Sequence, residues 1–131
     1  MAAIAHEIEI RVRYQETDGQ RRLHHANYLT YFELGRTELL RSLGRTYRDF
    51  EDSGLMMVVS EATCRYLAPA EYDDLLRLRT RVEKTGAAHI KHAYELVRGD
   101  RIIATGTTTV VCVDSTGAVR RLPEWMQGGT A

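Results

Sequence analysis

The stretch "YQETDGQRRLHHANYLTYFELGR", residues 14–36, joins a polar loop to the beginning of a helix. Its first half gathers acids, two arginines and two adjacent histidines, whereas apolar residues recur at helical spacing in its second half. The pattern predicts a helix from about Asn27 to Leu43, with Asn27 as the N-cap and Gly44 as the stop. A charged loop that ends at a helix N-terminus is a natural place to look for chemistry.

The rest of the chain reads mainly as strands. Residues 6–14 alternate strictly between apolar and charged side chains, which predicts a half-buried strand before the loop. A short second helix is expected at 46–54. Further strands are expected at 55–68, 73–84, 88–97 and 101–114, with a tail strand at 118–122. The order predicts an α+β fold, an antiparallel sheet of five to six strands with one long helix.

One helix of roughly 16 residues can cover only one face of such a sheet. The other face and the sheet edges must then meet water or another subunit, and we expect a symmetric homo-oligomer.

The composition narrows the function classes. A chain of 131 residues is expected to form a single domain, 1–131. Its formal net charge of zero argues against a nucleic-acid binder driven by bulk charge. No apolar run approaches the ~18 residues of a membrane span, and the first ten residues lack a signal-like stretch. Cys64 and Cys112 lie in apolar, strand-like runs without CxxC spacing, which favours free thiols and a cytoplasmic location.

Familiar catalytic motifs are missing from the sequence. The histidines and cysteines show no metal-ligand spacing, and no nucleophile elbow, P-loop or GxGxxG occurs. Asp18 remains, placed between a strand and a helix N-terminus. A carboxylate there could act as general base or nucleophile on a carbonyl that the helix N–H groups polarise, and a thioester suits this chemistry. The competing interpretation is that Asp18 only caps a turn.

Residues 14–36 resemble the signature of the hotdog-fold acyl-CoA thioesterases, of the 4-hydroxybenzoyl-CoA thioesterase and YbgC/FadM type. The segments "YDDLLRLRTRV" and "ATGTTTVVCVD" are similar to later strands of that family. The resemblance implies a sheet wrapped around one long central helix and hydrolysis of an acyl-CoA, or an acyl-carrier-protein thioester. It implies no cofactor besides the coenzyme A of the substrate, and the spacing of the histidines and cysteines predicts no metal site.

The resemblance also implies roles for individual residues. Asp18 falls on the catalytic aspartate, and His25 on the position whose backbone N–H polarises the thioester carbonyl. Tyr14 falls on a tyrosine that shapes the site, although it could equally be a core strand residue. Asn27 falls on the asparagine that holds the loop and caps the helix, and Glu33 is a weaker candidate for a chemical role.

The remaining implied positions concern the substrate. The substrate- and CoA-binding residues that the resemblance implies are Asn27, Val59, Ser60, Arg65, Lys84, Thr85 and His89. Val59 and Ser60 would line the pantetheine channel, and residues 84–89 would approach the phosphates. A basic strand face is expected from Arg65, Arg79 and Arg81, which could also be ordinary solvated surface.

One residue departs from the family pattern. Arg21 stands where a glycine is usual, and a positive φ there would cost an arginine roughly 1 kcal/mol or more. The loop could instead take another path, with Gly19 supplying the flexibility. Arg21 and Arg22 could favour a polar or acidic acyl group, or could simply be solvated.

The expected partners are a thioester substrate and copies of the chain itself, as a homodimer or homotetramer, with no nucleic acid and no membrane insertion. Two other functions stay open at this point: an acyl-thioester hydratase or dehydratase on the same fold, and a non-catalytic hotdog module that binds acyl chains or a protein.

Overall fold

The computed structural model describes residues 4–127 as one sheet with three α-helices and a 3-10 turn. The elements in chain order are β1 (Ala5–Arg11), η1 (Tyr14–Glu16), α1 (Ala26–Ser42), α2 (Tyr47–Asp52), β2 (Leu55–Tyr66), β3 (Leu75–Thr85), β4 (His89–Arg98), β5 (Arg101–Asp114) and α3 (Glu124–Gln127). The predicted order of a strand, a long helix, a short helix and an antiparallel meander is confirmed, and α3 is an addition that the sequence pattern did not reveal.

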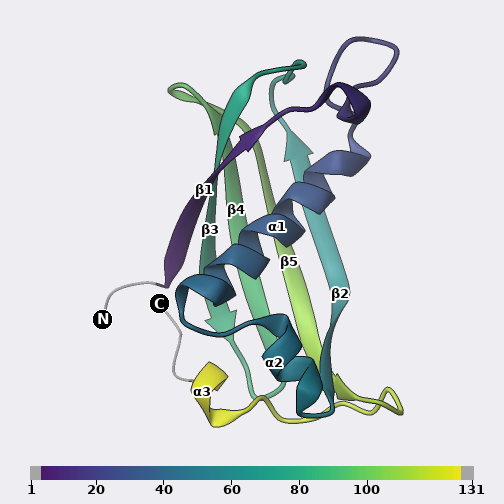
Figure 1. Cartoon of the computed structure of the whole chain (residues 1–131), viewed down its shortest axis with the longest axis vertical. Helices are drawn as coiled ribbons and strands as arrows, with labels where there is room; N and C mark the ends of the chain where they lie inside the picture. The colour runs from purple at the N-terminus through teal and green to yellow at the C-terminus, as the bar shows by residue number, and fades with distance from the viewer. Residues whose placement is uncertain (1–3, 128–131) are drawn as a thin grey trace.

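The five strands form one antiparallel sheet in the order β1-β3-β4-β5-β2 (Figure 1). The tail strand expected at 118–122 is wrong, because Val119 makes only an isolated bridge to Val113. Strands β1 and β2 are the two edges of the sheet. Since β2 is 12 residues long, its unpaired side leaves a long row of backbone groups without a neighbouring strand.

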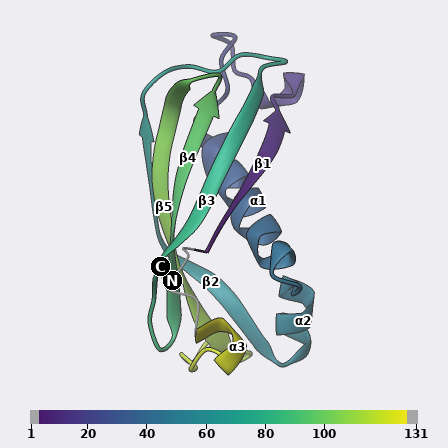
Figure 2. The ribbon, with the colours of Figure 1, turned by 90° about the vertical axis from the view of Figure 1, so that its left-hand side faces the viewer.

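Helix α1 packs diagonally across one face of the sheet, and Figure 2 shows the opposite face uncovered. Close approach depends on Gly35, where an added Cβ would lie 2.3 Å from Thr80 Oγ1. Gly106 on β5 plays the matching role, because a Cβ there would lie 2.4 Å from the Phe32 ring. The Phe32 ring in turn stacks on Tyr94, with centroids 4.3 Å apart. Phe32 and Tyr94 belong to one of two buried clusters of the core, and the second gathers around Leu39, Leu40 and Phe50.

Different segments form the two ends of the sheet. The loop before α1 and the end of β2 lie at one end of the sheet, and the β3–β4 hairpin lies at the other (Figure 1).

None of the helices within residues 4–127 is long and apolar enough to cross a membrane. Cys64 and Cys112 are free thiols, as expected, with Cys64 half-buried and Cys112 buried.

Candidate active site

Glu16 organises the loop between β1 and α1. Its buried carboxylate accepts hydrogen bonds from Arg13 N–H at 2.8 Å and from the Tyr31 hydroxyl at 2.7 Å. Burial acts to raise the pKa of Glu16, but the hydrogen bonds from Arg13 and Tyr31 outweigh it and leave the pKa below its usual value. Its carbonyl accepts from His24 N–H and from the Asn27 amide, both at 2.9 Å. Glu16 therefore ties the start of the loop to its end.

This network corrects one expectation for Asn27. The residue at the N-cap of α1 is His25, and Ala26 N–H is capped by His24 Nδ1 at 3.0 Å. Asn27 already lies inside the helix, so its predicted cap is wrong. Its predicted role in holding the loop is confirmed by the hydrogen bond to the Glu16 carbonyl.

Asp18 divides its carboxylate between a turn and solvent. Oδ1 accepts from Gln20 N–H at 2.8 Å and from Arg22 N–H at 3.2 Å, so the turn-capping interpretation is correct for this oxygen. Oδ2 accepts no hydrogen bond from residues 4–127. The hydrogen bond from Gln20 lowers the pKa of Asp18 most, with further lowering from Arg22 and the nearby His24. The group is thus an ionised carboxylate at neutral pH with one oxygen available.

Arg21 keeps the backbone conformation expected of a glycine. Its φ is +66°, in the left-handed region, and its N–H donates to the Asp18 carbonyl at 3.0 Å. Gly19 shows no positive φ. The alternative path with Gly19 as the flexible point is therefore wrong, and the strain expected at Arg21 is present.

His25 meets the condition for polarising a carbonyl. Its N–H stands at the N-terminus of a 17-residue helix, where N–H groups have no partner within the helix, and it donates to no acceptor among residues 4–127. Its own carbonyl accepts from the Tyr66 hydroxyl at 3.0 Å, which fastens the peptide to the end of β2. The His25 ring is exposed and stacks on His24, with centroids 4.2 Å apart.

Tyr14 and Glu33 lie away from the interior. Tyr14 is 76% exposed, so the alternative that it is a core strand residue is wrong; its ring meets the Tyr72 ring edge-on, with centroids 5.6 Å apart. Glu33 is exposed on α1. Neither side chain hydrogen-bonds the Asp18 carboxylate.

A single chain does not bring the expected CoA-binding residues together. Val59 and Ser60 lie midway along the edge strand β2, next to a bulge, and are exposed. Lys84, Thr85 and His89 lie at the β3–β4 hairpin, at the opposite end of the sheet from Asp18 (Figure 1). Of these expected residues, Asn27 is the one that hydrogen-bonds to the Asp18 loop within one chain, through the Glu16 carbonyl.

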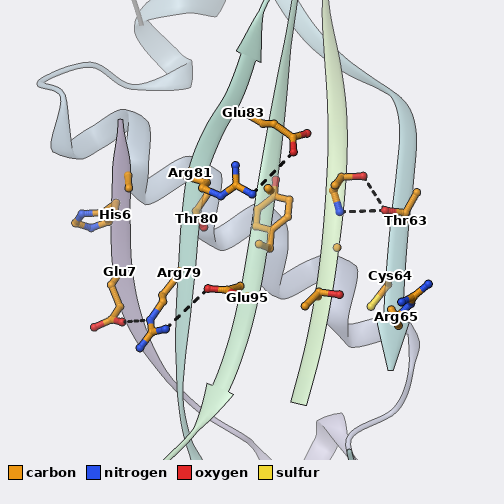
Figure 3. Close-up of a pocket in the computed structure, with 16 residues that line it drawn as sticks. His6, Glu7, Thr63, Cys64, Arg65, Arg79, Thr80, Arg81, Glu83 and Glu95 are labelled. Atoms are coloured by element: carbon orange, nitrogen blue, oxygen red, sulfur yellow. Dashed lines mark hydrogen bonds and ion pairs between the residues drawn. The ribbon is translucent and has the colours of Figure 1, made fainter. Parts of the chain in front are cut away.

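The prediction of a basic strand face is wrong, because carboxylates pair with its arginines. Arg79 pairs with Glu7 at 3.0 Å and with Glu95 at 3.8 Å, and Arg81 pairs with Glu83 at 3.9 Å. These ion pairs edge a hollow of about 940 Å³ on the face of the sheet away from α1, which Arg65 also lines (Figure 3). Acids and bases alternate there, so this face is not a cationic surface.

Two residues of the site escaped the sequence analysis. Tyr31 stands in the quoted stretch, and its spacing from Glu16 could have suggested a link only if the loop path had been known. Tyr66 is 41 residues from His25, and no local pattern joins them. Both phenols have a raised pKa because of burial, to about 12 for Tyr66, and so stay protonated hydrogen-bond donors.

Comparison with known proteins identifies the family. The family model described as the thioesterase-like superfamily matches residues 12–129. The chain belongs to this superfamily. It is 37% identical to the acyl-CoA thioesterase YbgC of Haemophilus influenzae over 106 residues, which cover 80% of this chain and 78% of the relative. It is also 34% identical, over 85 residues, to the chloroplastic acyl-acyl carrier protein thioesterase ATL3 of Arabidopsis thaliana, covering 65% of this chain and 45% of that protein.

Solved structures of this thioesterase superfamily agree with the fold. The crystal structure of a DHNA-CoA thioesterase from Staphylococcus aureus matches with a TM-score of 0.89 and 29% identity, over 93% of this chain and 83% of that one. The resemblance drawn from residues 14–36 is thereby confirmed, and the five-stranded antiparallel sheet with its helices is consistent with the predicted hotdog fold.

Proposed function

We propose that this thioesterase-superfamily chain is an acyl-CoA thioesterase in which Asp18 is the base or nucleophile. The observation that carries the proposal is the Asp18 carboxylate, ionised and with Oδ2 available, in the loop that leads directly to the N-terminus of α1. The names of its relatives support acyl-CoA thioester hydrolysis. We assign the hotdog fold in its full form, with the sheet curving around α1 as the central helix.

The chemistry follows from the two ends of the loop. The thioester carbonyl oxygen accepts a hydrogen bond from His25 N–H, which stabilises the negative charge that develops there. In one route, Asp18 Oδ2 takes a proton from water as the water oxygen bonds to the carbonyl carbon. In the other, Oδ2 attacks that carbon itself, and the acyl-Asp18 anhydride left after the thiol departs is hydrolysed by water. The C–S bond then breaks, the thiol takes up a proton, and the carboxylic acid leaves. Tyr66 and Glu16 keep the His25 peptide and the loop in place.

Because Val59, Ser60 and the β3–β4 hairpin lie apart from Asp18 in one chain, we propose that a partner subunit completes the CoA site. A homodimer formed through β2 would place the partner's strand beside the end of the molecule that carries His25, and two dimers could join as a tetramer. Coenzyme A enters only as part of the substrate, and no other cofactor has a part in the steps above. The free thiols support a cytoplasmic location.

The test is thiol release from a panel of acyl-CoA and acyl-carrier-protein thioesters, followed with a chromogenic thiol reagent. The panel should include short, long and aromatic acyl groups, and an enoyl-CoA whose conjugated absorbance is followed in parallel. We expect thiol release from at least one acyl-CoA. Loss of the enoyl absorbance without free thiol would identify a hydratase instead, and binding without any reaction would identify a non-catalytic acyl-binding module.

A further inference from the structure

A second cavity, open to solvent beside Leu43 and Trp125, lies at the far end of α1 from Asp18. It has a volume of about 270 Å³ and lies between the C-terminal half of α1, the ends of β3 and β4, and α3. Leu39 and Leu40 line it from the helix, and Met126 from α3. At 1.5 Å per helical residue, Leu39 stands about 20 Å along α1 from His25. The cavity is therefore separate from the loop that carries Asp18.

The lining carries positive charge and no negative charge. Arg36 and Arg45 line the cavity, and no aspartate or glutamate does. Arg36 is half-buried, its guanidinium lies beside the Tyr47 and Tyr94 hydroxyls, and it makes no ion pair with a carboxylate of residues 4–127. Glu33, three residues earlier on α1, is exposed to solvent. A partly desolvated guanidinium without a counter-ion is costly, and an anion that enters the cavity would remove that cost.

His92 adds a buried polar atom that lacks a hydrogen-bond partner. His92 is only 3% exposed, and its Nδ1 has no hydrogen-bond partner in the described part of the chain. Burial, with a smaller contribution from the Arg36 charge, lowers its pKa to about 4, so the ring is neutral at pH 7. In the tautomer that carries hydrogen on Nδ1, the ring can donate to an anionic oxygen. Tyr47 and Thr85 supply further hydroxyls in the lining.

We propose that this cavity binds a monocarboxylate with a short apolar tail, the carboxylate held by Arg36 and His92 and the tail by the leucines. Its volume of about 270 Å³ is several times the ~30 Å³ that one water molecule occupies in the liquid, so the cavity can admit a short acyl chain, for which octanoate is the probe. A free carboxylic acid of this kind is the class of product that a thioesterase releases. Binding at the Arg36 cavity does not depend on the proposed function, because it uses none of the residues of the Asp18 loop.

The chain carries its own reporter for this binding. Trp125 is the single tryptophan of the sequence, lines the cavity and lies 4.7 Å under the Arg45 guanidinium. Titration of the full chain with octanoate should change the Trp125 fluorescence saturably. Octanamide, of the same size but neutral, should bind about 10- to 100-fold more weakly, because hydrogen bonds to charged groups are the stronger ones.

Variants locate the site. Arg36→Gln should weaken octanoate to the level of octanamide, whereas Arg41→Gln, on the same helix but paired with Glu38 outside the cavity, should leave binding unchanged. If Arg36→Gln does not fold, His92→Phe keeps the ring shape, removes the nitrogens and should also weaken octanoate. Asp18→Asn should bind octanoate as the wild type does.

Four results would overturn the proposal: no saturable change in fluorescence, equal affinity for octanoate and octanamide, undiminished octanoate binding in both Arg36→Gln and His92→Phe, or loss of binding in Asp18→Asn. Failure of thioester hydrolysis alone would leave octanoate binding intact, so the two proposals fail independently.

Discussion

At the scale of single residues, the two oxygens of Asp18 serve different ends. Oδ1 holds the turn through Gln20 and Arg22, and Oδ2 stays open to a reactant. The turn therefore fixes the carboxylate in position without occupying it. The same hydrogen bonds hold the pKa of Asp18 below its ordinary value, so the group keeps its negative charge at neutral pH. Its charge is constant over the pH range in which the thioesterase chemistry is expected.

Arg21 gives a prediction at this scale. Its φ of +66° favours glycine, so Arg21→Gly should leave the free energy of unfolding unchanged or raise it by up to about 1 kcal/mol. Arg22→Gly is the matched control, since Arg22 shows no positive φ. This variant should lower the free energy of unfolding by roughly 0.5–1 kcal/mol, because glycine adds conformational entropy to the unfolded chain. Chemical denaturation of the three proteins measures both changes. Equal destabilisation by the two substitutions would show that Arg21 is not strained.

At the scale of elements, β2 is the longer of the two edge strands, and the backbone groups on its outer side have no neighbouring strand. It is an edge strand of 12 residues, and Met56, Val58 and Val59 on it are large apolar side chains exposed to solvent. The other edge, β1, carries Glu7, which is engaged with arginines of β3. Long, apolar edges recruit another strand unless they are blocked by charge. The element itself thus favours β2 as the place where a second copy adds.

This gives a prediction for the oligomeric state. Light scattering after size exclusion should give at least twice the 14.9 kDa mass of the chain. Val59→Lys should shift the protein toward the monomer, because it places like charges at the proposed subunit junction. Val119→Lys changes another exposed valine, away from the β2 edge, and should keep the wild-type mass. A monomeric wild type, or an unchanged mass in Val59→Lys, would contradict pairing through β2.

At the scale of the whole molecule, the sequence predicted what local periodicity can carry. Alternation placed the strands, with the fourth meander strand matching β5 over 101–114, and helical spacing placed α1 to within one residue at each end. The motif placed Asp18 and His25 in one loop. Contacts between distant residues were missed, such as Tyr66 with His25 and Arg36 beside His92, because no short-range pattern encodes them. The helix cap was missed because His24 performs it with a ring nitrogen.

The charge of the outer sheet face was missed for a related reason. A strand read alone displays Arg79 and Arg81 as a basic row, whereas the sheet sets Glu7 of β1 and Glu95 of β4 beside Arg79. Neutralisation across strands depends on register, which the sequence of one strand does not contain.

The most direct test of the central claim is the turnover number of Asp18→Asn on the best acyl-CoA of the panel. Asparagine keeps an oxygen to accept from Gln20 and Arg22, so the loop should persist while the base or nucleophile is lost. Asp100→Asn, in the exposed β4–β5 turn, is the matched control and should retain wild-type turnover. We predict that kcat falls by about 10²- to 10⁴-fold in Asp18→Asn. Unchanged turnover in a folded Asp18→Asn protein would contradict the account.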